Sequence, residues 1–237
     1  MNDWPLYLGV PLWGWLFVAP ALLALACAVF PDRLGTMLRP VWGVLDRIYL
    51  AGGIAGAFFL VLILVLIVGQ MIARWASLPF PGSTEFAGYS MAATSFLTMA
   101  YALNRGAHIR VSILLNISPF TRLWVDAFAM FIAAITASYF ARYAIKTNFL
   151  SKMLNDRTQG QDMVPEWLLT FFAMFKTWPT GWGQLWAATG PDMVFTPMWL
   201  PQLPMSAGTM LLALALWDNL TRLMVNRESS IRGEGVK

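Results

Sequence analysis

The stretch from Ile48 to Ala73 carries no charged side chain, and its only amide is Gln70. About 20 apolar residues suffice for a helix to cross the hydrocarbon core of a bilayer. In lipid, only helices and closed barrels satisfy their backbone polar groups. Because the apolar residues here follow one another without alternation, we expect a spanning helix and an integral membrane protein.

The composition agrees with a membrane protein, because 58% of the residues are hydrophobic and only 12% are charged, against about 25% charged in soluble domains. The net charge is +4, and such an excess can indicate nucleic-acid binding. Lys and Arg in the loops of a membrane protein explain it better, so no nucleic-acid partner is expected. Cys27 is the only cysteine and His108 the only histidine. A disulfide, a cysteine metal cluster and a bis-histidine haem within the chain are therefore excluded, and no cofactor is expected.

Three further apolar runs are long enough for spanning helices: Phe86–Leu103, Leu123–Ala141 and Met205–Val225. Together with Ile48–Ala73 they predict four transmembrane helices in an all-α, polytopic bundle. Lys and Arg flank several of these runs, as is typical of membrane helix ends.

Residues 5–30 form an additional apolar run, which Pro11 and Pro20 interrupt. A signal peptide begins with a positive region, whereas the only charge before this run is Asp3. We therefore expect an extra N-terminal apolar helix, retained as a span or half buried, with a cleaved or interfacial segment as the alternative. Pro31–Arg47 is interpreted as a short basic connector.

Residues 162–195 contain prolines, a lysine and several tryptophans, which argue against a full span. Tryptophans are enriched at the headgroup level of membranes, so we expect this segment to be interfacial, on the outer surface. The expected division is residues 1–44 for the N-terminal segment with its connector, 45–225 for the membrane domain, and 226–237 for a tail.

The distribution of Lys and Arg predicts the orientation, since loops on the cytoplasmic side carry more of them. One side holds ten: Arg33, Arg39, Arg47, Arg105, Arg110, Arg122, Arg222, Arg227, Arg232 and Lys237. The other holds six: Arg74, Arg142, Lys146, Lys152, Arg157 and Lys176. The side with ten, which includes the C-terminus, is expected to be cytoplasmic.

Two small-residue faces are candidates for protein contacts within the membrane. Gly52 and Gly56 are four residues apart, a spacing that allows two helices to approach closely, although glycine is also common in membrane helices without such a role. Ser90, Thr94 and Thr98 recur every fourth residue and so share one helix face. In lipid such a polar face should meet protein.

Four charged or titratable residues flank the span Phe86–Leu103. Glu85 is interpreted either as a first-turn acid favoured by the helix dipole or as a contact to a partner protein. His108 is interpreted either as an interfacial side chain in the headgroups or, with Arg105 and Arg110, as part of a clamp for a phospholipid phosphate or a partner loop.

The membrane acids have a simple explanation as internal pairs. Asp126 follows Arg122 by four residues, and Asp218 precedes Arg222 by four, so each pair can neutralise itself on one helix face. A coupling-ion site needs acids, amides and unwound backbone near the midplane, which the sequence does not offer. No metal-binding or catalytic motif is present either, so the chain is not expected to be an enzyme.

Glu85 before its span, the run Arg105-Gly-Ala-His-Ile-Arg-Val111 after it, and Thr196-Pro-Met-Trp-Leu-Pro-Gln-Leu-Pro204 carry a family resemblance. On these features the chain resembles the small, DctQ-like membrane subunit of tripartite ATP-independent periplasmic (TRAP) transporters, over roughly residues 45–225. Against that family, residues 162–195 look like an insertion.

The resemblance implies a bacterial inner-membrane protein that scaffolds a large membrane subunit. In the family a periplasmic binding protein delivers an organic acid, and the large subunit carries the sodium and substrate sites. The alternative is a quinone-type membrane anchor of a respiratory or dehydrogenase complex. A third class, an autonomous small carrier or channel, is disfavoured by the lack of a polar midplane site.

Overall fold

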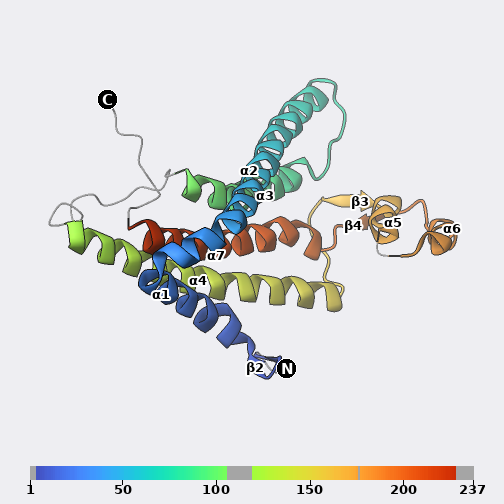
Figure 1. Ribbon diagram of the computed structural model, residues 1–237. Coiled ribbons are helices and arrows are strands. Elements are labelled where there is room, and N and C mark those ends of the chain that lie inside the picture. The colour runs from blue at the N-terminus through green and yellow to red at the C-terminus, as the bar shows by residue number, and fades with distance from the viewer. Residues whose placement is uncertain (1–3, 106–118, 176, 228–237) are drawn as a thin grey trace.

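The computed structural model describes residues 4–105, 119–175 and 177–227, and for residues 119–122 the backbone only. The described chain is a helical bundle with two short two-stranded sheets, shown in Figure 1. The prediction of an all-α integral membrane protein is confirmed. The main helices are α1 (Ala19–Val29), α2 (Pro31–Trp75), α3 (Ser83–Asn104), α4 (Pro119–Met153) and α7 (Trp199–Asn226).

Three helices are long and apolar enough to cross a membrane: α2, α4 from Leu123 onward, and α7. The predicted span Phe86–Leu103 is also helical, because it lies within α3, whose 22 residues give about 33 Å at ~1.5 Å per residue. Its hydroxyl side chains lower its hydropathy, so α3 is not among those three.

The expected connector Pro31–Arg47 is wrong, because α2 continues through it as one helix of 45 residues. Proline is tolerated at the first helical position, where its missing N–H costs nothing, and Pro31 occupies that position. Packing then holds the first half of α2 on α7, where a Cβ added to Gly35 would lie 2.7 Å from Val225 Cγ1. Pro40 is accommodated inside the helix.

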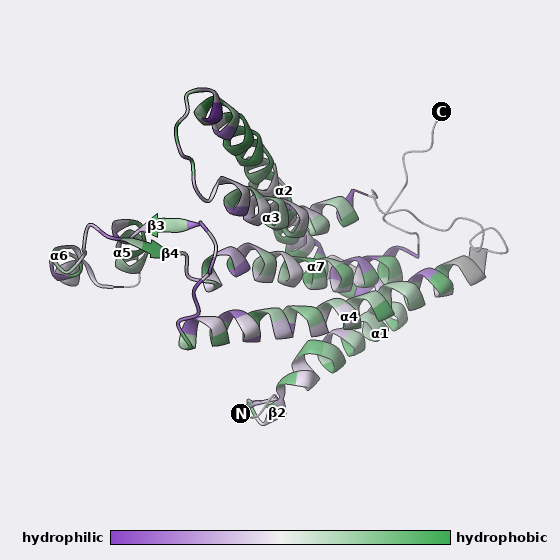
Figure 2. Ribbon diagram, turned by 180° about the vertical axis from the view of Figure 1, so that it is seen from behind, coloured by the Kyte–Doolittle hydropathy of each residue, from purple (hydrophilic) through white to green (hydrophobic). Residues whose placement is uncertain are grey.

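The core lies where α4 packs along α7, with α3 on the other side of α7 (Figures 1 and 2). Small side chains dominate the contact, and Ala134 and Ala215 are completely buried. Trp217 fills the remaining space, and its Nε1 donates a hydrogen bond to Ser138 Oγ (2.9 Å). Near the other end, Asn148 Nδ2 donates to the Trp199 carbonyl (2.8 Å). Small residues let membrane helices approach closely.

The N-terminal apolar run is helical but shorter than a full span. After the hairpin β1 (Leu6–Tyr7) and β2 (Val10–Pro11), the π-helix η1 (Gly14–Val18) leads into α1. Residues Gly14–Val29 fall below the length needed to cross a membrane. Ala24 and Cys27 of α1 are buried in the core cluster, so this segment is an additional helix packed on the bundle.

Residues 163–195 form a lobe that we call the arm, beyond the end of α4 (Figure 1). Strands β3 (Met163–Pro165) and β4 (Met193–Phe195) pair antiparallel at its base. Between them lie α5 (Glu166–Met174), the 3₁₀ turn η3 (Pro179–Gly181) and α6 (Trp182–Ala187). Both α-helices are too short to span a bilayer, as expected from the sequence.

Candidate functional site

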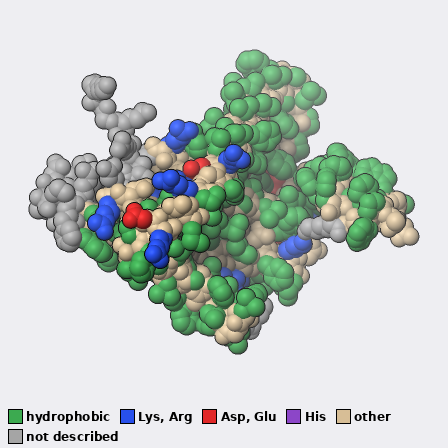
Figure 3. Space-filling model, viewed as in Figure 1, with side chains coloured by type: hydrophobic (Ala, Val, Ile, Leu, Met, Phe, Trp, Pro, Cys, Tyr) green, Lys and Arg blue, Asp and Glu red, His purple; other side chains and the backbone are tan. Residues whose placement is uncertain are grey.

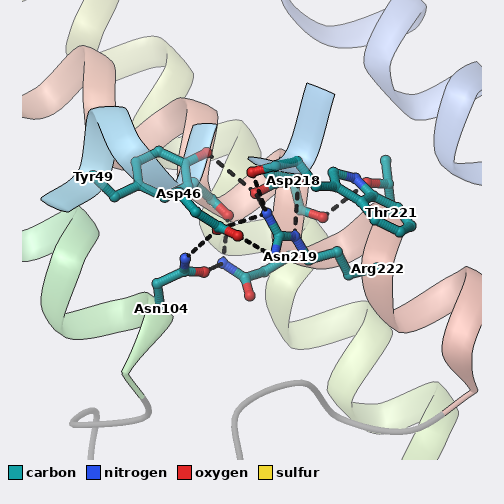
Figure 4. A network of polar contacts seen from close by, with 9 residues as sticks. Asp46, Tyr49, Asn104, Asp218, Asn219, Thr221 and Arg222 are labelled. Atoms are coloured by element: carbon teal, nitrogen blue, oxygen red, sulfur yellow. Dashed lines mark hydrogen bonds and ion pairs between the residues drawn. The ribbon is translucent and has the colours of Figure 1, made fainter. Parts of the chain in front are cut away.

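Charged side chains gather where α2, α3 and α7 converge, and Arg222 of α7 is central among them (Figures 3 and 4). Its guanidinium pairs with Asp218, one turn earlier, at 2.9 Å. It also pairs with Asp46 of α2 at 2.8 Å and donates to the Trp42 carbonyl at 3.2 Å. The planar guanidinium suits such an arrangement, because its donors form a rigid fork that can bind several acceptors.

Amide and phenol groups extend this cluster to α3. Asn104, the last residue of α3, donates from Nδ2 to Asp46 Oδ1 at 2.9 Å and accepts from Asn219 Nδ2 at 3.1 Å. Tyr49 Oη donates to Asp218 Oδ2 at 3.3 Å. We call these residues, Asp46, Tyr49, Asn104, Asp218, Asn219 and Arg222, the polar network.

The polar network is suited to joining helices. Asp218, Asn219 and Tyr49 are buried, and buried charges are costly unless they are paired and hydrogen-bonded. Asp46 of α2 takes its donors from α3 and α7, and Asp218 of α7 accepts from Tyr49 of α2 besides its pair within the helix. Separating these helices would break the contacts between them. The predicted pair Asp218–Arg222 is confirmed, but Asp46 is a second acid that the sequence spacing did not reveal.

The glycine and hydroxyl faces predicted from the sequence meet each other within the chain. A Cβ on Gly52 would lie 3.0 Å from the Leu97 carbonyl, and one on Gly56 would overlap the Thr98 methyl group. Thr94 Oγ1 donates to the Gly56 carbonyl at 3.2 Å. The close helix contact is therefore present, and within this chain it joins α2 to α3.

Ser90 is buried on α3, and its hydroxyl donates to the Phe86 carbonyl at 2.8 Å in its own helix. Thr98 likewise donates to the Thr94 carbonyl at 2.8 Å. Such bonds to the preceding turn satisfy a hydroxyl in an apolar environment. The face is thus satisfied locally, apart from the bond of Thr94 to α2.

Glu85 lies in the first turn of α3, as predicted. Its Oε1 accepts a hydrogen bond from the Gln161 backbone N–H at 3.2 Å, so it contacts the loop that precedes the arm. At the other end of α3, the Arg105 guanidinium lies 5.3 Å from the centre of the Tyr101 ring. His108 and Arg110, the other members of the expected phosphate clamp, lie outside the described residues, as does the side chain of Arg122.

Sequence reasoning missed Asp46, Asn104 and Asn219, which structure places in the polar network. Two of these residues could have been recognised from the sequence. Asn104 is an amide at a helix end and Asp46 is an acid inside a helix, and buried polar groups of both kinds need hydrogen-bond partners. Asp46 was assigned to a connector, so no helix face was considered for it. It also missed Asp162, a fully buried acid in the loop before the arm.

Part of the chain matches a known protein family. Residues 63–175 match the model of the family described as tripartite ATP-independent periplasmic transporters, DctQ component. The match is narrower than the resemblance over residues 45–225, and it ends inside the arm. No curated protein and no solved structure matches the chain.

The matched residues include the last part of α2, from Ile63, all of α3 and the described part of α4. They contain the hydroxyl face of α3, whereas Gly52 and Gly56 of α2 lie before the match. The family is a transporter component and not an enzyme family, and it favours the transporter reading over the quinone-type anchor. The match over residues 63–175 supports a DctQ-like small subunit of a TRAP transporter.

Proposed function

We propose that this chain scaffolds the large membrane subunit of a TRAP transporter in a bacterial inner membrane. The large subunit would carry out sodium-driven uptake of an organic acid that a periplasmic binding protein delivers. Phospholipid would cover the remaining apolar surface. The C-terminus would face the cytoplasm, because the Arg-rich segments Pro31–Arg47 and Arg105–Arg122 lie on its side.

The observation that carries this proposal is the uncovered outer face of α2. Only 11% of the most apolar stretch of α2 is buried, against 33% in α4 and in α7. Ile54, Phe58, Val61 and Val65 recur at helical spacing on this face, and each is more than half exposed. The apolar half of α2 packs mainly against α3, which leaves a long apolar stripe for another protein or lipid.

The interior supports the same role, because the charged groups of the polar network bind one another. Arg222 holds Asp46 and Asp218 together, and the amides of Asn104 and Asn219 complete the contacts. These side chains join helices of this chain to one another. We therefore assign them to assembly of the scaffold and place substrate and ion binding in the large subunit.

A photo-crosslinking amino acid placed at Phe58 is expected to form a covalent adduct with the large subunit in membranes that contain both subunits. The measurement is the mass of the adduct on a denaturing gel, with the identity of the partner established by mass spectrometry. Phe58 is 63% exposed on the uncovered stripe of α2.

The matched control is Phe140 of α4, which is 64% exposed but lies on a helix that is packed along α7. We expect the probe at Phe140 to react with lipid alone. Efficient crosslinking at Phe140 together with none at Phe58 would place the large subunit on the wrong face for this proposal. Absence of the large subunit from the adducts of both probes would contradict the scaffold role.

The arm is proposed to lie on the outer membrane surface. Its exposed aromatic residues include Trp167, Phe171, Phe172, Phe175, Trp178 and Trp186. Tryptophan and other amphipathic aromatics favour the headgroup level. Figure 3 shows the visible face of this lobe as largely hydrophobic, and in Figure 1 it lies at the end of the molecule opposite the C-terminal ends of α3 and α7.

A cysteine at Gln184, in a Cys27→Ser background, is expected to react from outside intact cells with a membrane-impermeant thiol reagent. Gln184 is exposed and polar. A cysteine at Phe175, which is 73% exposed, should react only after detergent is added, because lipid would cover it. Labelling of Gln184→Cys from the cytoplasmic side alone would reverse the proposed orientation.

A further inference from the structure

The loop before the arm docks tightly on the beginning of α3. Gly82, which precedes α3, is buried and has φ = +76°, a conformation that favours glycine. A Cβ there would lie 2.8 Å from the Gln161 carbonyl oxygen and 2.9 Å from Asp162 Cα. The backbone N–H and the hydroxyl of Thr196 both donate to the Asp162 carbonyl. The position of Asp162 is thus fixed from two sides.

The side chain of Asp162 is completely buried, with 0% of its surface exposed. Tyr89 of α3 donates a hydrogen bond from its hydroxyl to Asp162 Oδ2 at 2.7 Å. Within the part of the chain that the structure describes, no donor reaches the other oxygen, Oδ1. A second buried oxygen of the same loop, Thr158 Oγ1, also lacks a partner among these residues. Buried polar atoms in native proteins nearly always have one.

A second carboxylate faces the same point. A Cβ added to Gly160 would lie 2.9 Å from Asp162 Oδ1 and 3.2 Å from Glu85 Oε1, so both oxygens point toward one small volume. The first-turn N–H groups of α3 give this end of the helix a partial positive charge, which favours one acid. This partial charge provides no hydrogen bond to Asp162 Oδ1. It is also too small to neutralise two neighbouring carboxylates.

We propose that Glu85 and Asp162 bind a hard divalent cation, of which Ca²⁺ is the best fit. Carboxylate and hydroxyl oxygens are the ligands that Ca²⁺ prefers, and the ion accepts backbone carbonyls and water for its remaining positions. Two acids match its double charge. Glu85 is only half buried, which provides access from solvent. The ion would tie the loop before the arm to α3, and this proposal does not depend on the transport function.

The affinity expected for two carboxylates in such a site is modest, with a Kd of about 1 mM, within the weak class of extracellular calcium modules. The full-length chain, purified in detergent with a chelator and then dialysed, is heated with and without 10 mM CaCl₂ at constant ionic strength. The expected result is a rise in Tm of about 3–6 °C. Equilibrium dialysis with radioactive Ca²⁺ should show about one bound ion per chain.

The variants Asp162→Asn and Glu85→Gln should each abolish the Ca²⁺-dependent rise, whereas Asp192→Asn, at an exposed acid of the arm, should keep it. Asp162 is fully buried, so Asp162→Asn could fail to fold. Glu85 is half exposed, so Glu85→Gln is expected to fold and still tests the site. The proposal is overturned if the wild-type Tm does not respond to Ca²⁺, or if the response survives in Glu85→Gln. An equal rise with the same concentration of Na⁺ would also overturn it.

Discussion

Replacing Gly208 with leucine is expected to force α3 and α7 apart and to lower the free energy of unfolding of the bundle. A Cβ at this position would overlap the carbonyl carbon and oxygen of Phe96. These are backbone atoms, which cannot rotate away as a side chain can. Overpacking of a core costs roughly 1–3 kcal/mol, occasionally more, and a backbone clash belongs at the upper end.

The measurement is thermal unfolding in detergent, followed by the fluorescence of the 12 tryptophans. For a chain of this size ~3 kcal/mol corresponds to a Tm loss of about 6–12 °C. Gly88→Leu is the matched control, because the same change on α3 places the new side chain in open space. A Tm for Gly208→Leu equal to that of Gly88→Leu would show that α3 and α7 do not cross at this point.

The second large effect is expected for Arg222→Met. Removing the guanidinium leaves Asp218 buried without its main partner and takes the shared contact from Asp46. Breaking a buried ion pair by deleting one partner costs about 3–5 kcal/mol. We expect a comparable loss in the free energy of unfolding and a loose contact between α2 and α7. Thermal unfolding of the purified chain again supplies the measurement.

Two further variants test whether the loss of stability in Arg222→Met comes from the polar network or from a general folding defect. Arg222→Lys should recover part of the stability, because lysine keeps the charge but not the fork that binds both acids. Arg222→Met combined with Asp218→Leu should be more stable than Arg222→Met alone, since it removes the unpaired buried charge. If the double variant were less stable than the single one, the network would not be the reason for the loss.

Much of the helical content could be predicted from the sequence, because long uncharged runs such as Ile48–Ala73 are a strong local signal. The pair Asp218–Arg222 could be predicted for the same reason, since spacing along one helix is local. Contacts between distant segments could not. Asp46 and Arg222 are 176 positions apart, and neither residue's neighbours indicate the other.

Pro31–Arg47 was wrongly interpreted as a connector for a related reason, because its helical structure also depends on distant residues. Arginines and two prolines indicate a connector when the segment is considered alone, but α7 supplies a surface on which Gly35 and its neighbours pack. Tertiary contacts then outweigh the local preference. The glycine pair Gly52/Gly56 shows the opposite case. Its close contact was predictable from spacing, whereas the identity of the neighbouring helix required the fold.

The length of α2 has a consequence for how the protein responds to its membrane. Its uncharged stretch Ile48–Ala73, roughly 26 residues, is about 39 Å long, whereas the hydrocarbon core is ~30 Å thick. Such a mismatch is relieved by tilting the helix, and α2 is inclined to α4 and α7 (Figure 1). A thicker bilayer would make α2 more upright, and because Arg222 holds Asp46, that rotation would strain the anchorage of α2 to α7.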